Sequence, residues 1–265
     1  MRYLGGKHFQ ARAYVGHLIN EIGTVYVEPF AGGFNTAAEL VRQRSPFRRH
    51  VYSDLMADTV ELHRAVMDRY EPQPVSRERF NELKAGSRGA LEAHAIGLLQ
   101  TFSGKRWGAY VPTDALGPHD NETRFNAACN GLKRSAGALK SLQGLSLAVG
   151  PYTDLLIPDG AVVYCDPPYA STAGYNTGSG FDSAAFWIWA NELAKRCTVY
   201  VSEYTVPGDW EVIYSQDRLA SVATNNATAP RLELLVRKSP IPSAIKRVLS
   251  SSGLTAGAGQ LAMFS

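Results

Sequence analysis

Short apolar runs alternate with amphipathic segments in the first part of the chain. TVYVEPF and HVYSD are typical of strands, whereas NTAAELVRQ and ADTVELHRAVMDRY have the periodicity of helices. Asn35 is expected to cap the first of these helices. Strands that alternate with helices predict a parallel sheet with crossover helices over residues 1–70.

The same alternation returns after residue 142. LSLAV, GAVVYC and CTVYVSEY are predicted strands, and RLASVAT and RLELLVRK are expected to form a closing antiparallel pair. A helix is predicted between GAVVYC and CTVYVSEY, because apolar residues recur there at helical spacing. Its predicted buried face consists of Phe186, Trp189, Ala190 and Leu193.

The middle segment, residues 71–141, breaks this pattern. It begins with the proline-containing EPQPVS, continues through a turn-rich stretch that could hold a hairpin, and ends in a predicted helix from Thr123 to Leu142. We therefore predict one α/β domain formed by residues 1–70 and 142–238, with 71–141 as an inserted subdomain. Residues 239–265 are rich in Ser, Gly and Ala and are expected to be a flexible tail.

Composition narrows the class of protein. With 265 residues, the chain can form one large domain or one domain with an insertion. It has neither an apolar run long enough for a bilayer nor an N-terminal signal pattern, so no membrane association is expected. The three cysteines are far apart in sequence, which argues against a disulfide framework or a zinc site and favours a cytoplasmic location.

Positive charge is concentrated in the middle of the chain. Residues 77–140 contain ten Lys and Arg against six Asp and Glu, a net charge of +4, whereas the whole chain carries +3. A polyanionic partner would fit this distribution. Charge alone would favour the alternative, an ordinary solvated helical surface.

A glycine turn follows the first strand. Gly32 and Gly33 lie between that strand and a helix, and Asp54 ends the next strand, 22 residues after Gly32. Such a turn lets the backbone approach a ligand, and a carboxylate at this spacing can accept hydrogen bonds from ribose hydroxyls. The GxGxxG pattern is incomplete and GGKH is not a phosphate loop. A nucleoside cofactor without a pyrophosphate is therefore favoured over a dinucleotide, with a simple tight turn as the alternative.

Four motifs give the chain a family resemblance. YLGGK (3–7), EPFAGGF (28–34), YSD (52–54) and DPPY (166–169) occur in this order, followed by VSEY and RLELLV. In this combination the chain resembles the Dam-type DNA adenine-N6 methyltransferases of bacteria and phages, over about residues 1–70 and 145–238. The resemblance implies a Rossmann-like doubly wound sheet, S-adenosyl-L-methionine as cofactor, and a mostly helical and hairpin target-recognition subdomain at 71–141.

The resemblance also implies which residues contact the cofactor. These are Tyr3, Lys7, Phe30, Gly32, Asp54 and Asp166. Tyr3 and Lys7 would lie at its methionine end, and Asp54 would hold its ribose. The family's FxGxG loop is altered, because Phe34 stands where the last glycine is expected. The shape of the loop is therefore left open.

DPPY suits methyl transfer to an exocyclic amine, which is a poor nucleophile while its lone pair is shared with the ring. Asp166 and the carbonyl of Pro167 can accept hydrogen bonds from the two amine hydrogens, and Pro168 helps to fix the backbone. Tyr169 offers a flat face for a base flipped out of the duplex. No metal is expected. The alternative is a Pro-Pro turn capped by aspartate. The glycine-rich segment 170–181 could close over the base or be an ordinary connection.

The target is expected to be double-stranded DNA, bound through the middle segment. The candidate DNA-binding residues are Lys105, Arg106, Trp107, Tyr110, Arg124, Lys133 and Arg134. Each of them could also be an ordinary surface residue. The recognition sequence, and the presence of a partner nuclease for restriction-modification, do not follow from the sequence.

The last residues contain a possible docking peptide. Gln260, Leu261, Met263 and Phe264 form QLxMF on the expected flexible tail. The pattern resembles the short peptides that bind the bacterial sliding clamp. Packing of the tail on its own domain is the alternative.

The main hypothesis is therefore a site-specific DNA adenine-N6 methyltransferase. Three others remain: a cytosine-N4 or RNA amino methyltransferase, a catalytically silent DNA-binding protein of the same fold, and a small-molecule dehydrogenase. The intact Asp54, Asp166 and Tyr169 disfavour the silent protein, and the incomplete GxGxxG disfavours the dehydrogenase.

Overall fold

The computed structural model describes residues 10–86, 90–102, 106–112, 121–168, 181–218 and 231–240. The helices are α1 (Ala11–Leu18), α2 (Asn35–Arg42), α3 (Ala57–Met67), α4 (Arg77–Ala85), α5 (Leu91–Leu99), α6 (Asn121–Ser141) and α7 (Ser183–Leu193). The strands are β1 (Val25–Glu28), β2 (Arg49–Asp54), β3 (Leu145–Val149), β4 (Val162–Cys165), β5 (Thr198–Glu203), β6 (Glu211–Arg218) and β7 (Arg231–Lys238). A 3-10 turn, η2 (Tyr152–Asp154), follows β3.

The described strands form a seven-stranded mixed sheet in the order β3-β2-β1-β4-β5-β7-β6. β2 and β3 are parallel, as are β1 and β4, and β4 and β5, whereas β7 runs antiparallel to both β5 and β6. Every residue of β1 and β4 is buried, which explains why β4, and β1 up to Glu28, are continuously apolar and not alternating. The predicted α/β class with a Rossmann-like doubly wound sheet is confirmed.

The chain divides into two compact units. Unit 1 comprises residues 1–20 and 29–155, and unit 2 comprises residues 21–28 and 156–265. These units are defined by the packing of the chain and not by function. The predicted separation into a catalytic domain and a target-recognition subdomain therefore stays a prediction.

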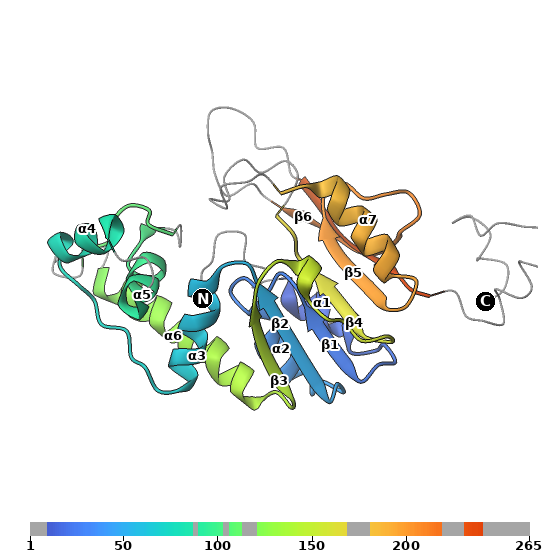
Figure 1. The fold of residues 1–265 in the computed structure, drawn as a ribbon, viewed down its shortest axis with the longest axis horizontal. Coiled ribbons are helices and arrows are strands. Elements are labelled where there is room, and N and C mark those ends of the chain that lie inside the picture. The colour runs from blue at the N-terminus through green and yellow to red at the C-terminus, as the bar shows by residue number, and fades with distance from the viewer. Residues whose placement is uncertain are drawn as a thin grey trace, which may run out of the picture. The chain divides into compact units, whose positions relative to one another are not determined.

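Within unit 1, the helices α3 to α6 follow one another along the chain (Figure 1). They share an apolar core. Leu62 of α3, Phe80 of α4, Ile96 of α5 and Leu132 of α6 are all buried in it. The middle segment is therefore helical as predicted. Thr101 and Tyr110 form an antiparallel bridge, at the place where a hairpin was expected.

Unit 2 has α7 beside an antiparallel strand pair (Figure 1). Phe186, Ala190 and Leu193 are buried on one face of α7, as the periodicity predicted, whereas Trp189 is only half-buried. The strand pair differs from the prediction, because the partner of β7 is Glu211–Arg218 and not RLASVAT. EVIYSQDR is partly exposed and lacks a clear apolar alternation, so its pattern did not mark it as a strand. Residues 219–224 lie outside the described residues.

The start of α2 also corrects a prediction. Asn35 is the first helical residue, and the cap position belongs to Phe34, which makes no side-chain capping bond. Phe34 has a φ of +54°, a left-handed backbone conformation that glycine adopts more readily. Its ring is fully buried, with its centroid 4.4 Å from that of His63 and 5.6 Å from that of Tyr52. Burial of the ring offsets the backbone cost.

None of the helices in the described ranges is both long and apolar enough to cross a membrane.

Candidate active site

The turn that follows β1 is held against the end of β2 in unit 1. The Ala31 amide donates to the carbonyl of Ser53 at 3.0 Å, and the Gly32 amide donates to Oδ2 of Asp54 at 2.7 Å. Gly32 reaches this position with a φ of +49°. The 22-residue spacing between the glycine and the acid therefore corresponds to a direct contact.

Asp54 is fixed by two backbone donors. Besides Gly32, the Met56 amide donates to its Oδ1 at 2.8 Å. Burial raises the pKa of Asp54 above its ordinary value, the amides of Met56 and Gly32 act in the opposite direction, and the charge of Asp58 raises it further. The two amides use two of the roughly four lone-pair sites of the carboxylate. The residue as a whole is half-buried.

Two aromatic rings lie beside the same turn. Phe30 and Tyr152 have ring centroids 5.1 Å apart, and both side chains are half-buried. Tyr152 is in η2, just after β3, where the Gly150 amide donates to the carbonyl of Asp54. The loops after β2 and β3 thus converge on the glycine turn within unit 1.

Asp166 lies in unit 2, directly after β4. Ser202 of β5 donates to its Oδ1 at 3.0 Å, and the hydroxyl of Tyr164 lies 3.1 Å from Ser202 Oγ. An ionised carboxylate only accepts hydrogen bonds, so the proton of Ser202 points to Asp166 and Tyr164 donates to Ser202. This relay sets the orientation of the carboxylate. Pro167 is buried and Pro168 is half-buried after it.

Negative charge accumulates at this end of β4. Burial raises the pKa of Cys165 well above its ordinary value, and the charges of Glu28 and Asp166 raise it further. Cys165 therefore stays a neutral thiol. The neighbouring Glu28 ends β1, the parallel partner of β4, and accepts a hydrogen bond of 2.7 Å from Tyr26. Glu28 and Asp166 thus lie at the C-terminal ends of adjacent parallel strands, the edge at which ligands bind in doubly wound sheets.

Several predicted site residues lie outside the described residues. They are Tyr3, Lys7, Lys105, Tyr169, the segment 170–180, and the tail residues Gln260, Leu261, Met263 and Phe264. Their roles stay predictions. Of the others, Phe30, Gly32 and Asp54 lie together in unit 1, and Asp166, Pro167 and Pro168 lie in unit 2.

The aromatic residues of the hairpin pack inward. Trp107 and Tyr110 are only half-exposed, and each packs edge-on against Phe80. The Tyr110 hydroxyl donates to the carbonyl of Val75 at 3.1 Å, and the guanidinium of Arg77 lies 4.7 Å from its ring centroid. These contacts give both residues a packing role, and the predicted DNA contacts remain untested.

The basic residues predicted to contact DNA differ in the contacts that they make within the protein. Arg106 forms an ion pair with the buried Asp58, and Lys133 forms one of 2.9 Å with Glu71. Arg124 lies over the ring of Phe102, 5.8 Å from its centroid. Arg134 is exposed on α6.

Sequence reasoning missed Ser202, Tyr164 and Tyr152. Ser202 is 36 residues from Asp166, and its role depends on the register that places Val201 opposite Cys165. The only signal available for Ser202 was its place near the end of the apolar run TVYVSE, because a buried polar side chain needs a hydrogen-bond partner.

Comparisons with known proteins identify similar structures but no family. No family model matches the chain, and no curated protein matches it. Among solved structures, the rRNA methyltransferase aviRa from Streptomyces viridochromogenes is 15% identical, with a TM-score of 0.39 over 91% of this chain and 86% of that one. A putative RNA methyltransferase from Pyrococcus horikoshii, PH1948, is 10% identical, with a TM-score of 0.42 over 88% and 84%. The putative methyltransferase yhhF from Escherichia coli is 11% identical, with a TM-score of 0.38 over 88% of each chain. Values this low do not decide the family or the substrate.

Proposed function

We propose that this chain is an S-adenosylmethionine-dependent methyltransferase that methylates the exocyclic N6 of adenine in DNA. The observation that carries the proposal is the carboxylate of Asp166, which directly follows a buried parallel strand, is oriented by Ser202, and precedes two prolines. A carboxylate held in this way is a preorganised hydrogen-bond acceptor.

The glycine turn fits the proposed cofactor. Gly32 and Met56 fix the Asp54 carboxylate and leave acceptor sites for the two hydroxyls of a ribose. Phe30 and Tyr152 provide apolar surface next to the turn for the adenine or the methionine chain. Tyr3 and Lys7 are proposed for the methionine end on the resemblance alone.

The residues after β4 fit the chemistry at the amine. S-adenosylmethionine supplies an electrophilic methyl group, so the protein has to make the nitrogen lone pair available and align it. Asp166 and the Pro167 carbonyl would accept the two N–H bonds and draw the nitrogen towards tetrahedral geometry. Because Asp166 and Pro167 each precede a proline, their backbone is restricted to extended conformations, which fixes the direction of that carbonyl. Asp166 is also the candidate acceptor for the proton that the nitrogen loses.

Nucleoside analysis tests the proposal. The chain is incubated with methyl-labelled S-adenosylmethionine and either unmethylated duplex DNA of mixed sequence or RNA. Label in N6-methyladenine from DNA is expected. Label in cytosine or only in RNA would overturn the proposed substrate, and no label with any substrate would overturn the proposed enzyme.

A matched pair of variants ties the activity to the site. Asp166→Asn keeps the shape of the side chain but loses the charge, and is expected to abolish transfer while DNA binding is retained. Asp159→Asn alters a highly exposed carboxylate in the loop before β4 and should have wild-type activity. Equal activity in both variants would exclude Asp166 as the acceptor.

A further inference from the structure

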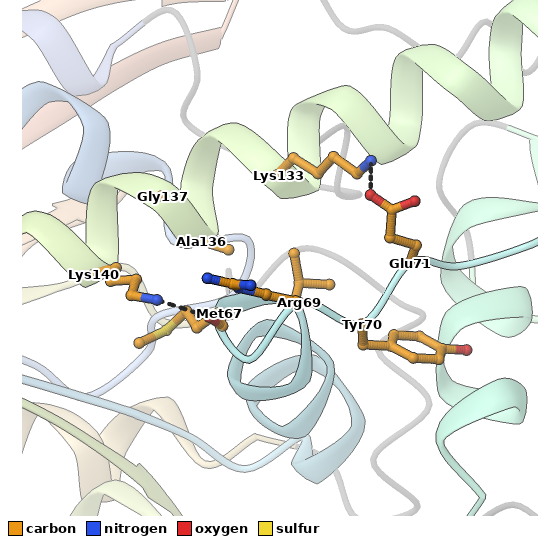
Figure 2. A pocket seen from close by; sticks show the side chains of 9 residues that line it. Met67, Arg69, Tyr70, Glu71, Lys133, Ala136, Gly137 and Lys140 are labelled. Atoms are coloured by element: carbon orange, nitrogen blue, oxygen red, sulfur yellow. Dashed lines mark hydrogen bonds and ion pairs between the residues drawn. The ribbon is translucent and has the colours of Figure 1, made fainter.

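A hollow of about 320 Å³ lies between the end of α3 and one face of α6 in unit 1 (Figure 2). Its lining carries three cationic side chains, Arg69, Lys133 and Lys140, and one carboxylate, Glu71. In Figure 2, Arg69 extends from the end of α3 towards α6, between the two lysines. The four charges sum to +2 at neutral pH.

Gly137 of α6 lines the hollow and faces open space. A Cβ built at Gly137 would have no neighbouring atom within 4 Å. A glycine inside a helix lowers helix stability, and here it leaves space beside cationic side chains.

The carbonyls at the C-terminal end of α3 would repel an anion if they were exposed, but they are already satisfied. The amides of Asp68 and Tyr70 donate to the carbonyl of Ala65, and that of Arg69 donates to Val66. Lys140 Nζ donates to the carbonyl of Met67 at 3.2 Å. The negative end of the helix is thus capped, partly by a cation of the hollow itself.

The cations are weakly engaged by the protein. Arg69 is exposed, and its guanidinium forms no ion pair or hydrogen bond with any part of the chain that the structure describes. Lys133 pairs with Glu71 at 2.9 Å, but their side chains are 47% and 66% exposed. An ion pair exposed to water contributes little free energy to folding, so Lys133 can release Glu71 and bind a stronger anion in its place. The hollow therefore offers one guanidinium that the described part of the chain does not engage, and two lysines held only by exposed contacts.

We infer that this hollow binds a phosphate group of the nucleic-acid backbone and anchors the substrate on unit 1. The inference rests on the proposed function for the nature of the substrate. Arg69 is the main contact because its planar guanidinium donates two parallel hydrogen bonds to a phosphate, whereas Lys133 and Lys140 contribute charge. The contact holds the backbone and carries no base specificity.

Arg69 has an internal control elsewhere in unit 1. Arg69 follows α3 with a φ of +73°, and Arg44 follows α2 with a φ of +57°. In both cases the arginine amide and the next amide close the end of the helix, and both side chains are exposed. Arg44 does not line the hollow. Glycine suits this backbone conformation better, so Arg69→Gly and Arg44→Gly should both keep or raise the thermal unfolding midpoint.

The experiment measures binding of a fluorescein-labelled DNA duplex by anisotropy over a series of salt concentrations. Arg69→Gly is expected to weaken binding about five- to tenfold near 0.1 M salt and to reduce the slope of log K against log salt by about 1. Arg44→Gly should match the wild type in both quantities. Wild-type affinity and slope in Arg69→Gly, or an equal loss in both variants, would overturn the inference.

Glu71 provides a test of opposite sign. Glu71→Gln removes the carboxylate from the hollow and releases Lys133, so duplex binding should tighten about two- to fivefold. Unchanged or weaker binding would show that the hollow does not hold phosphate.

Failure of the inference can be distinguished from failure of the proposed function. If the wild type methylates DNA and Arg69→Gly binds it normally, only the hollow is excluded. If binding depends on Arg69 but no methyl group is transferred, only the proposed enzyme is excluded. A wild type that binds no duplex would overturn both.

Discussion

Ser202 donates a hydrogen bond of 3.0 Å to Oδ1 of Asp166 across two neighbouring parallel strands. The hydroxyl of Tyr164 lies 3.1 Å from Ser202 Oγ. Tyr164 and Ser202 thus form a buried chain of two hydroxyl groups that ends on the carboxylate of Asp166. Ser202 does not need to touch a substrate to matter. It positions the group that would accept the amine protons.

Removal of Ser202 Oγ should therefore impair turnover more than binding. We expect Ser202→Ala to lower kcat about 10- to 100-fold, the range for one hydrogen bond to a charged group, with little change in KM. Tyr164→Phe removes the outer member of the relay and should cost less. Initial rates of methyl transfer at varied substrate concentrations separate the two parameters.

The exposed Ser146 of β3 provides the control, since Ser146→Ala should leave both parameters unchanged. If Ser202→Ala lowers the thermal midpoint but keeps the wild-type kcat, Ser202 has only a structural role.

Asp54 gives a prediction for cofactor binding. Loss of its carboxylate in Asp54→Ala should weaken S-adenosylmethionine binding about 10- to 100-fold, because hydrogen bonds to the ribose and the anchor of Gly32 are both lost. Isothermal titration calorimetry measures this directly. Asp68→Ala changes an exposed carboxylate of unit 1 and should bind like the wild type. Equal affinity in the two variants would place the ribose elsewhere.

Much of the sheet could be predicted from the sequence, and so could the positions of Asp54 and Asp166 at strand ends. The signals were local, because Asp54 ends the strand-like HVYSD, Asp166 directly follows the apolar VVYC, and the ends of parallel strands share one edge. Strands buried on both faces, such as β4, give continuous apolar patterns that are easy to recognise. β6 is partly exposed and gave no such pattern.

The surroundings of the site could not be predicted, because they depend on contacts distant in sequence. Trp107 and Tyr110 resembled DNA-contacting residues next to Lys105 and Arg106, yet both pack against Phe80. Arg106 has its partner in Asp58, on a helix that precedes the middle segment. The spacing of apolar residues predicts whether a segment is a helix or a strand and which of its faces is buried. It does not predict which residues from elsewhere in the chain pack against that face.

Substitution of alanine for two helix glycines, Gly97 and Gly137, should change the free energy of unfolding in opposite directions. A Cβ at Gly97 of α5 would lie 2.7 Å from Cε2 of Trp107, whereas one at Gly137 of α6 meets nothing within 4 Å. Gly137→Ala should raise the free energy of unfolding by up to about 1 kcal/mol through helix propensity. Gly97→Ala should lower it by about 1–3 kcal/mol, because the indole must shift within the packed cluster.

Urea unfolding followed by circular dichroism measures both variants. Tryptophan fluorescence should change in Gly97→Ala and not in Gly137→Ala. Stabilisation by both substitutions would mean that the packing of Trp107 on α5 is loose.

His63 predicts how stability depends on pH. The side chain is fully buried, and its Nδ1 donates to the carbonyl of Thr59 at 2.7 Å. Nε2 of the neutral ring lies 2.9 Å from Ser135 Oγ, whose one proton is shared between this nitrogen and the carbonyl of Leu132 at 3.0 Å. Burial disfavours the charged ring and lowers the pKa of His63 from 6.5 to about 4, although the Thr59 carbonyl acts in the opposite direction. The folded protein therefore stays neutral at this site at pH values where the unfolded chain already binds a proton. The contribution of neutral His63 to the free energy of unfolding should be fully present above about pH 7. It should be lost, by up to about 3 kcal/mol, as the pH drops from 6.5 to 4.

Urea unfolding at pH 7.5 and 5.5 tests this with the wild type and His63→Gln. The wild type should lose about 1 kcal/mol of unfolding free energy between these pH values because of His63. Glutamine does not titrate, so the variant should start less stable and lose less on acidification. The residual loss in the variant includes His50, whose pKa is also lowered by burial. An identical loss in both proteins would mean that His63 takes up its proton in the folded state as easily as in the unfolded chain.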